Sequence, residues 1–281
     1  MHEPETPGRV ARWTHRAHVL QGRVVAARSR HRSLDFGFGM VERDSSIGGG
    51  LLAGALAYRL FVLALPTSLL LVSGLGIYAG SVDESAQTVA RKAGLHGLIG
   101  TEVAQAASGR GRWLIFLLMI PAVLYALVTL YRAIAKVYAI VWLGSARGVP
   151  TSPGGIGVFA GALVVQLATA PVVRWVGTHR FGVVLAFLAY VLLIGGAWLA
   201  VSMRLPHRGV SWRRLLPGAA LFGVGLLGVN IFNVYITSRL VEGRANTYGA
   251  LGIATALLFS FVLVGRLIVT SAELNVALVE R

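Results

Sequence analysis

The chain has 281 residues, of which 56% are hydrophobic and only 13% charged, and its mean hydropathy is +0.71. Soluble domains are about a quarter charged, so the composition excludes an ordinary soluble domain and indicates a membrane protein. The lack of cysteine excludes disulfides, thiolate metal sites and thiol nucleophiles. The net charge of +15 comes mostly from arginines between apolar runs. There they set topology and contact anionic lipid headgroups, rather than nucleic acid.

Residues 1–47 form a basic N-terminal region, expected in the cytoplasm. Apolar residues recur in it at helical spacing: Val10, Trp13, Ala17, Leu20, Val24 and Ala27. This pattern fits a basic amphipathic helix lying on a membrane surface. A disordered basic tail is an equally good interpretation. The region lacks the continuous apolar core of a signal peptide, so the first span is expected to direct insertion.

Residues 48–281 are predicted to form an all-α transmembrane domain, a bundle of six helices. The expected spans cover about 51–78, 113 to between 130 and 143, 156–173, 183–203, 215–236 and 248–270. Each is long enough to cross a hydrocarbon core of about 30 Å, and the third fits most tightly. Pro66 is expected to break the first span, as in the broken helices that line binding sites in transporters. Kinked helices are also ordinary membrane architecture.

The segment 81–111, between the first two spans, is predicted to be an amphipathic insertion on the outer surface. Ser81 and Glu84 have capping-box spacing, and an apolar stripe follows them. Gly94 and Gly97 then predict a break before a second short helix.

Glycine is abundant, at 35 residues. Small residues spaced four apart let membrane helices approach closely, and we expect them to pack within the bundle. The pairs are Gly50/Gly54, Gly76/Gly80, Gly157/Gly161 and Ala219/Gly223.

Ionisable residues inside the spans are the main candidates for function, because each costs at least about 2.5 kcal/mol at a helix centre. Arg266 and Glu273 share a face of the last span with Thr270, and Asn230 and Asn233 share a face of the fifth. The candidate cavity-lining residues are Arg59, Arg132, Lys136, Asn230, Asn233, Arg266 and Glu273. A positive interior of this kind suits a lipid phosphate or a carboxylate.

A structural interpretation of the same residues stays open. Arg132 and Lys136 fit an interfacial helix outside the hydrocarbon core, and long side chains near helix ends reach the interface. Arg266 can pair with Glu273, and the asparagines can serve as interhelical hydrogen bonds.

No catalytic pattern is present, so we expect neither an enzyme nor a cofactor. The seven histidines form no metal-ligand spacing, and the chain has no nucleophile elbow and no P-loop. A metal site is therefore not predicted.

Several stretches resemble the YihY/BrkB family of integral membrane proteins. The strongest is the C-terminal one, in which residues 246–252 contain a Tyr-Gly-Ala-Leu-Gly turn and residues 271–278 read Ser-Ala-Glu-Leu-Asn-Val-Ala-Leu after an apolar run. Residues 55–58 with Leu65–Pro66, 132–138, and 205–219 are similar to the family's first span, its basic segment and the start of its fifth span. Ser271 replaces the family's usual glycine, and Arg59 its usual uncharged residue.

The resemblance implies a bacterial inner-membrane protein of six spans. The family has carried the label ribonuclease BN, and one branch is called a virulence factor for serum resistance. For this chain we expect binding or translocation of an anionic envelope lipid or metabolite, with membrane lipids as partners. The alternatives are a non-transporting scaffold for envelope integrity and, last in order, a membrane-bound ribonuclease.

The distribution of Lys and Arg predicts that both termini are cytoplasmic, because most of these residues then lie on the inner side. The segments assigned to that side carry the N-terminal arginines, Arg132, Lys136, Arg147, Arg204, Arg208, Arg213, Arg214 and Arg281. Single cysteines placed at residues 5 and 279 should both resist a membrane-impermeant thiol reagent in intact cells. Labelling of one terminus alone would contradict the even number of spans.

Overall fold

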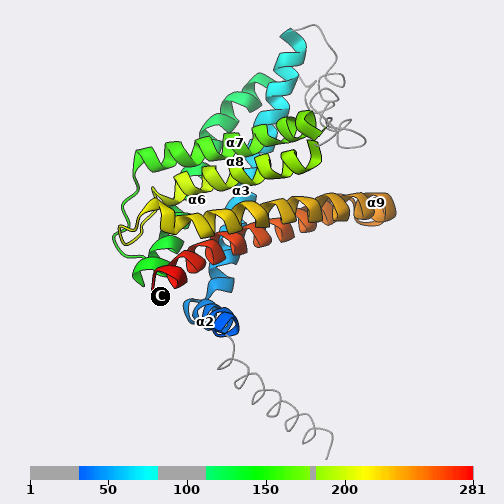
Figure 1. The fold of residues 1–281 in the computed structure, drawn as a ribbon. Coiled ribbons are helices and arrows are strands. Elements are labelled where there is room, and N and C mark those ends of the chain that lie inside the picture. The colour runs from blue at the N-terminus through cyan, green and yellow to red at the C-terminus, as the bar shows by residue number, and fades with distance from the viewer. Residues whose placement is uncertain (1–31, 82–111, 178–181, 281) are drawn as a thin grey trace, which may run out of the picture. The chain divides into compact units, whose positions relative to one another are not determined.

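The structure is a computed structural model that describes residues 32–81, 112–177 and 182–280, with most of their side chains. Every regular element in these ranges is a helix (Figure 1). The chain divides into two compact units, residues 1–48 and 49–281. The amphipathic pattern at residues 10–27, and all but the first residue of the predicted insertion 81–111, lie outside the described residues.

The described part of the first unit is helix α2, Arg32–Ile47. Asp35 lies in its first turn, where the positive end of the helix dipole favours a carboxylate. The helix ends at Gly48, whose φ of 67° lies in the left-handed region that glycine adopts without steric cost.

The described part of the second unit consists of α3 Gly49–Ser81, α6 Arg112–Leu143, α7 Pro153–Gly177, α8 Gly182–Ser202 and α9 Trp212–Val279. Five stretches in these helices are long and apolar enough to cross a membrane: Gly49–Ala79, Trp113–Leu143, Val184–Ser202, Trp212–Asn233 and Leu257–Val279. Large apolar side chains such as Leu51 and Leu192 are exposed on them, as expected where acyl chains replace water. The protein is a multi-pass helical membrane protein.

Helix α7 corresponds to the third predicted span. Its described apolar stretch, Pro153–Thr169, falls short of a full span. The whole helix has 25 residues, which gives it a length of about 37 Å. A sixth crossing through α7 therefore stays a prediction.

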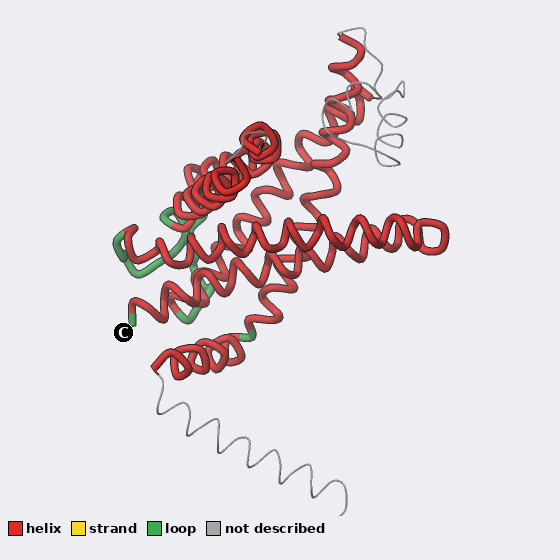
Figure 2. The backbone as a smooth tube through the Cα atoms, turned by 45° about the vertical axis from the view of Figure 1, so that its right-hand side comes forward, coloured by secondary structure: helices red, strands yellow, loops and turns green. Residues whose placement is uncertain are grey.

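Helix α9 is assigned over 68 residues, but it folds back on itself. The backbone N–H of Gly218 donates a hydrogen bond of 2.8 Å to Oδ1 of Asn275, 57 residues later. Its first arm, Trp212–Asn233, and second arm, Leu257–Val279, lie side by side (Figures 1 and 2). The second arm continues well beyond the predicted end at residue 270, because the stretch that follows is buried and packs as part of the helix.

Helix α3 continues through Pro66, where the sequence predicts a break. A proline removes one backbone donor and leaves a carbonyl of the preceding turn without its bond. Two hydroxyls next to it donate to carbonyls of that region: Thr67 Oγ1 to Leu63 at 2.7 Å, and Ser68 Oγ to Leu65 at 2.8 Å. The carbonyl that loses its donor to the proline is that of Val62, four residues earlier, and these two bonds reach other carbonyls. The helix is nevertheless continuous across Pro66, so the prediction of a helix break is wrong.

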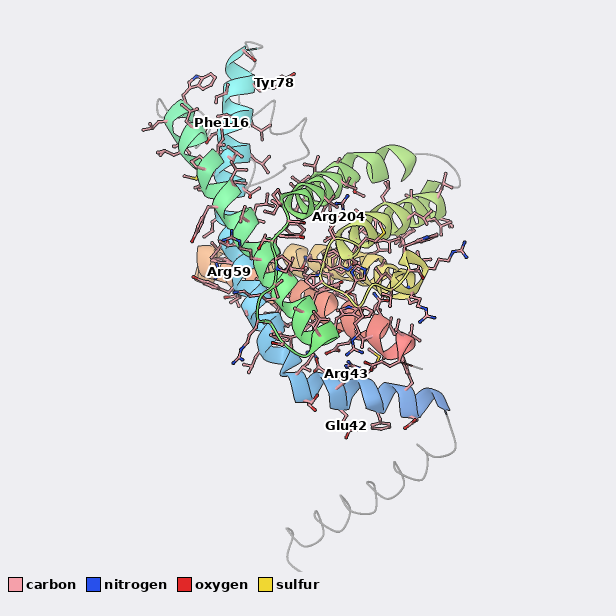
Figure 3. All side chains as sticks on the ribbon, turned by 90° about the vertical axis from the view of Figure 1, so that its left-hand side faces the viewer. Glu42, Arg43, Arg59, Tyr78, Phe116 and Arg204 are labelled. Carbon is pink, nitrogen blue, oxygen red and sulfur yellow. The ribbon has the colours of Figure 1, made fainter. Side chains whose placement is uncertain are left out.

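The core of the second unit lies around the C-terminal half of α6. Helix α3 packs against α6 and α9, and α8 packs against both α7 and α9 (Figure 2). Up to Tyr125 most side chains of α6 are exposed, whereas from Ala126 to Trp142 most are buried. Phe116 of α6 and Tyr78 of α3 mark the opposite end of the α3–α6 pair, away from this core (Figure 3).

The first arm of α9 packs closely on α8 through small residues, as the spacing of Ala219 and Gly223 predicts. A Cβ atom on Gly223 would lie 2.9 Å from the carbonyl oxygen of Val191 and 3.2 Å from the backbone nitrogen of Gly195. A Cβ on Gly195 would lie 3.2 Å from the carbonyl oxygen of Ala219. These two helices therefore meet backbone to backbone.

Two other glycine pairs do not serve this purpose. Around Gly50, Gly54, Gly157 and Gly161, no described atom lies within 4 Å of the position a Cβ would take. Their predicted role in packing within the bundle is wrong, because all of them face outward from their helices.

Gly223→Val should destabilise the bundle by about 1–3 kcal/mol, because the new side chain would push α9 away from α8. Gly228→Val is the matched control, since Gly228 lies on the same arm with open space around it. Thermal unfolding of the purified proteins in detergent measures both. An equal loss of stability in the two variants would contradict the packing described here.

Candidate functional site

Arg132 and Lys136 lie one turn apart on α6, and both side chains are exposed. The neighbouring Tyr131 donates its hydroxyl to the carbonyl oxygen of Arg204 at 3.3 Å, just beyond the end of α8. Helix α8 has 21 residues, about 31 Å, and so matches the thickness of the hydrocarbon core. This part of α6 is level with the end of α8, and Arg132 and Lys136 therefore lie near headgroup depth. The geometry favours the interfacial interpretation of this pair.

Arg266 lies deeper, on the second arm of α9. It is about 20 Å along the helix from Val279, where the arm ends. Its neighbour Gly265 packs so closely on α3 that a Cβ would collide with the carbonyl oxygen of Ala53. The side chain of Arg266 is half-buried and has an interaction partner within the structure. A guanidinium inside a membrane-spanning helix costs free energy, and such groups typically bind a partner side chain, a substrate or an ion.

Arg59 lies on α3, which packs on the same arm, but its side chain is exposed (Figure 3). The rings of Phe61 and Phe261 meet edge to face with their centroids 6.4 Å apart, which places this part of α3 beside the start of the arm. Arg59 is therefore neither level with Arg266 nor buried as it is.

Glu273 is the deeply buried member of the candidate set, with 2% of its surface exposed. It follows Arg266 by two helical turns, so about 10 Å of helix separates them. Thr270 lies between them on the same face and is half-buried. Glu273 also has an interaction partner within the structure, as a buried carboxyl group requires.

The structure adds Asn275, which is 1% exposed and which the sequence did not single out. Its Oδ1 accepts the backbone N–H of Gly218, directly after Pro217, and the two arms are in backbone contact at this point. A proline inside a helix disturbs the hydrogen bonding of the turn around it. In the sequence, the features that could have pointed to this contact are Pro217 in one apolar stretch and the polar residue Asn275 in the other.

Ser271 takes part in a buried hydroxyl network. Trp198 Nε1 donates to its Oγ at 3.3 Å, and this oxygen donates in turn to the Ile268 carbonyl at 2.9 Å. The Trp198 ring stacks on Phe222 with centroids 4.1 Å apart. The serine therefore ties α8 to the second arm of α9.

Asn230 and Asn233 join helices rather than standing in an open space. Asn230 Nδ2 donates to the hydroxyl of Tyr190 on α8, and Ser260 of the second arm donates to Oδ1 of Asn233. Both asparagines thus act as interhelical hydrogen bonds, the structural interpretation that the sequence left open.

The candidate residues therefore separate into three environments. Arg59, Arg132 and Lys136 are exposed, the asparagines lie in interhelical contacts, and Arg266 with Glu273 lies on one face of the second arm of α9. Within the described part of the chain, no group of three or more His, Asp or Glu side chains could hold a metal ion. Comparison with protein-family models, with curated proteins and with solved structures finds no match.

Asn275→Leu should destabilise the protein by about 1–3 kcal/mol, because the fixed backbone N–H of Gly218 would lose its acceptor in a buried site. Asn233→Leu should cost less, since the hydroxyl of Ser260 can turn to a carbonyl of its own helix. Thermal unfolding of both variants in detergent tests this order. Equal losses would show that the Gly218–Asn275 bond has no special weight.

Proposed function

We propose that this protein binds and translocates an anionic lipid or metabolite, with the face of α9 that carries Arg266 and Glu273 as its binding element. The observation that supports this most is the burial of Glu273 at 2% exposure within a membrane-spanning arm that also carries Arg266. Ionisable groups in such a position are expensive and typically serve a substrate or ion pathway.

The chemistry of the two residues fits an anionic headgroup. A guanidinium donates two parallel hydrogen bonds to a phosphate or carboxylate, and this interaction strengthens where water is excluded. The carboxyl group two turns away balances the guanidinium charge while no ligand is bound. Thr270, between them, adds a hydroxyl for a ligand oxygen.

The proposal includes a setting. We place the protein in the bacterial cytoplasmic membrane with both termini in the cytoplasm, and we consider it a member of the YihY/BrkB family. The stretch that resembles the family's closing motif, residues 271–278, is also among the most buried parts of the chain. This agreement supports the assignment, since a buried motif in contact with α8 and with the first arm is constrained by packing.

A scaffold function remains the second candidate, because α2 belongs to a compact unit separate from the membrane bundle. A scaffold acting through the N-terminal region would lose its function on deletion of residues 1–47. A transporter acting through α9 would largely keep it.

Translocation can be measured in proteoliposomes with fluorescently labelled phosphatidylglycerol, using dithionite to bleach the outer leaflet. Arg266→Ala should lower the rate at least about tenfold, because it removes a charge-assisted bond worth roughly 1.5–3 kcal/mol. Glu273→Gln should lower it as well, whereas Arg266→Lys should retain part of it. Arg147→Gln, which removes an exposed loop cation, is the control.

Two results would contradict the proposal. One is a wild-type protein that moves the labelled lipid no faster than empty vesicles do. The other is full activity in both Arg266→Ala and Glu273→Gln with unchanged melting temperatures.

A further inference from the structure

A basic surface lies where the chain passes from α8 to α9. It consists of the exposed side chains of Met203, Arg204, Arg208, Trp212, Arg213 and Arg214, and is called here the α8–α9 surface. The carboxylate of Glu280 approaches Arg208 at 3.5 Å, but both side chains remain largely exposed, at 56% and 41%. An ion pair this exposed and this long is weak, so the surface keeps a strong positive charge.

The surface lies at the depth of lipid headgroups. Helix α8 spans about 31 Å and ends at Ser202, so Met203 and Arg204 follow directly after a segment that matches the hydrocarbon core. Trp212 opens the first membrane-spanning arm of α9. The connection between these residues is therefore bounded on both sides by spans.

The α8–α9 surface combines apolar and basic side chains, as membrane interfaces do. Trp212 is 50% exposed, and the guanidinium carbon of Arg213 lies 5.6 Å from the centroid of its ring. Exposed Met203 and Leu216 flank the arginines on the side of the spans. Tryptophan is enriched at headgroup level, and arginine reaches from there toward phosphates.

Within the residues that the structure describes, little neutralises these arginines. The first turn of α9 contains Arg213 and Arg214 but no acidic residue, and the N-cap Ser211 makes no side-chain capping bond. The two guanidinium groups lie beside the partial positive charge of the helix N-terminus, and this repulsion is unfavourable unless an anion binds nearby. Arg204 is in a similar position, with Nη1 3.5 Å from the place a Cβ on Gly154 would take, in the first turn of α7.

We propose that the α8–α9 surface binds the phosphate headgroups of anionic phospholipids in the surrounding bilayer. This surface is separate from the intramembrane face of Arg266 and Glu273, and its role does not depend on translocation. Bound lipid would anchor the α8–α9 connection and neutralise the two helix starts. The surface recognises the lipid by the charge of its headgroup and not by its acyl chains.

The test is a titration of the purified full-length protein in detergent with dioleoyl phosphatidylglycerol or dioleoyl phosphatidylcholine, read by native mass spectrometry. Each arginine near an anionic lipid surface contributes about fivefold to affinity. Arg213→Gln/Arg214→Gln should therefore weaken binding of phosphatidylglycerol roughly 25-fold and leave phosphatidylcholine unchanged. Added salt should weaken the wild-type preference.

The matched control is Arg239→Gln/Arg244→Gln, which removes two charges from the connecting end of α9 and should leave the preference intact. Equal binding of the two lipids to the wild-type protein, or equal losses in the two double variants, would overturn the proposal. If the first variant fails to fold, Arg204→Gln/Arg208→Gln gives the same comparison. Loss of lipid preference with unchanged translocation would separate this surface from the α9 site.

Discussion

The interior of a bilayer offers no water to a polar group, and this constraint acts on the polar residues of the membrane-spanning helices. Where a helix cannot satisfy its own backbone, a side chain must do so. Asn275 accepts the N–H of Gly218 next to Pro217, and this bond joins the two arms of α9.

The constraint also sorts the charged residues by depth. Arg132 and Lys136 are exposed and lie near the level at which α8 ends. Arg266 and Glu273 lie along a spanning arm and have interaction partners within the fold. Only this second environment imposes a large energetic cost, and it is therefore the one to which we assign a ligand. The arginines of the α8–α9 surface belong with the first group in depth, but differ in gathering around two helix starts.

Close packing follows from a different property, the absence of a Cβ. Gly223 and Gly195 bring the first arm of α9 against α8, and Gly265 brings the second arm against α3. Trp198 of α8 contacts both arms of α9, because its ring stacks on Phe222 of the first arm and its Nε1 donates to Ser271 of the second. The stretch of α9 between residues 265 and 276 is consequently in contact with α3, α8 and the first arm together. Arg266 and Glu273 both lie on this stretch.

The sequence by itself determined the helical class, the positions of five spans and the few residues whose charge is anomalous in a membrane, because hydropathy and helical period are local properties. It also indicated that Ala219 and Gly223 pack closely. It could not tell which glycine pairs face a partner, since Gly50/Gly54 and Gly157/Gly161 have the same spacing but face outward. Nor could it assign depths to Arg132 and Arg266, or find Asn275, whose importance comes from a residue 57 positions away. Only the tertiary structure decided these, because contacts between helices depend on how the helices cross and not on the spacing within one.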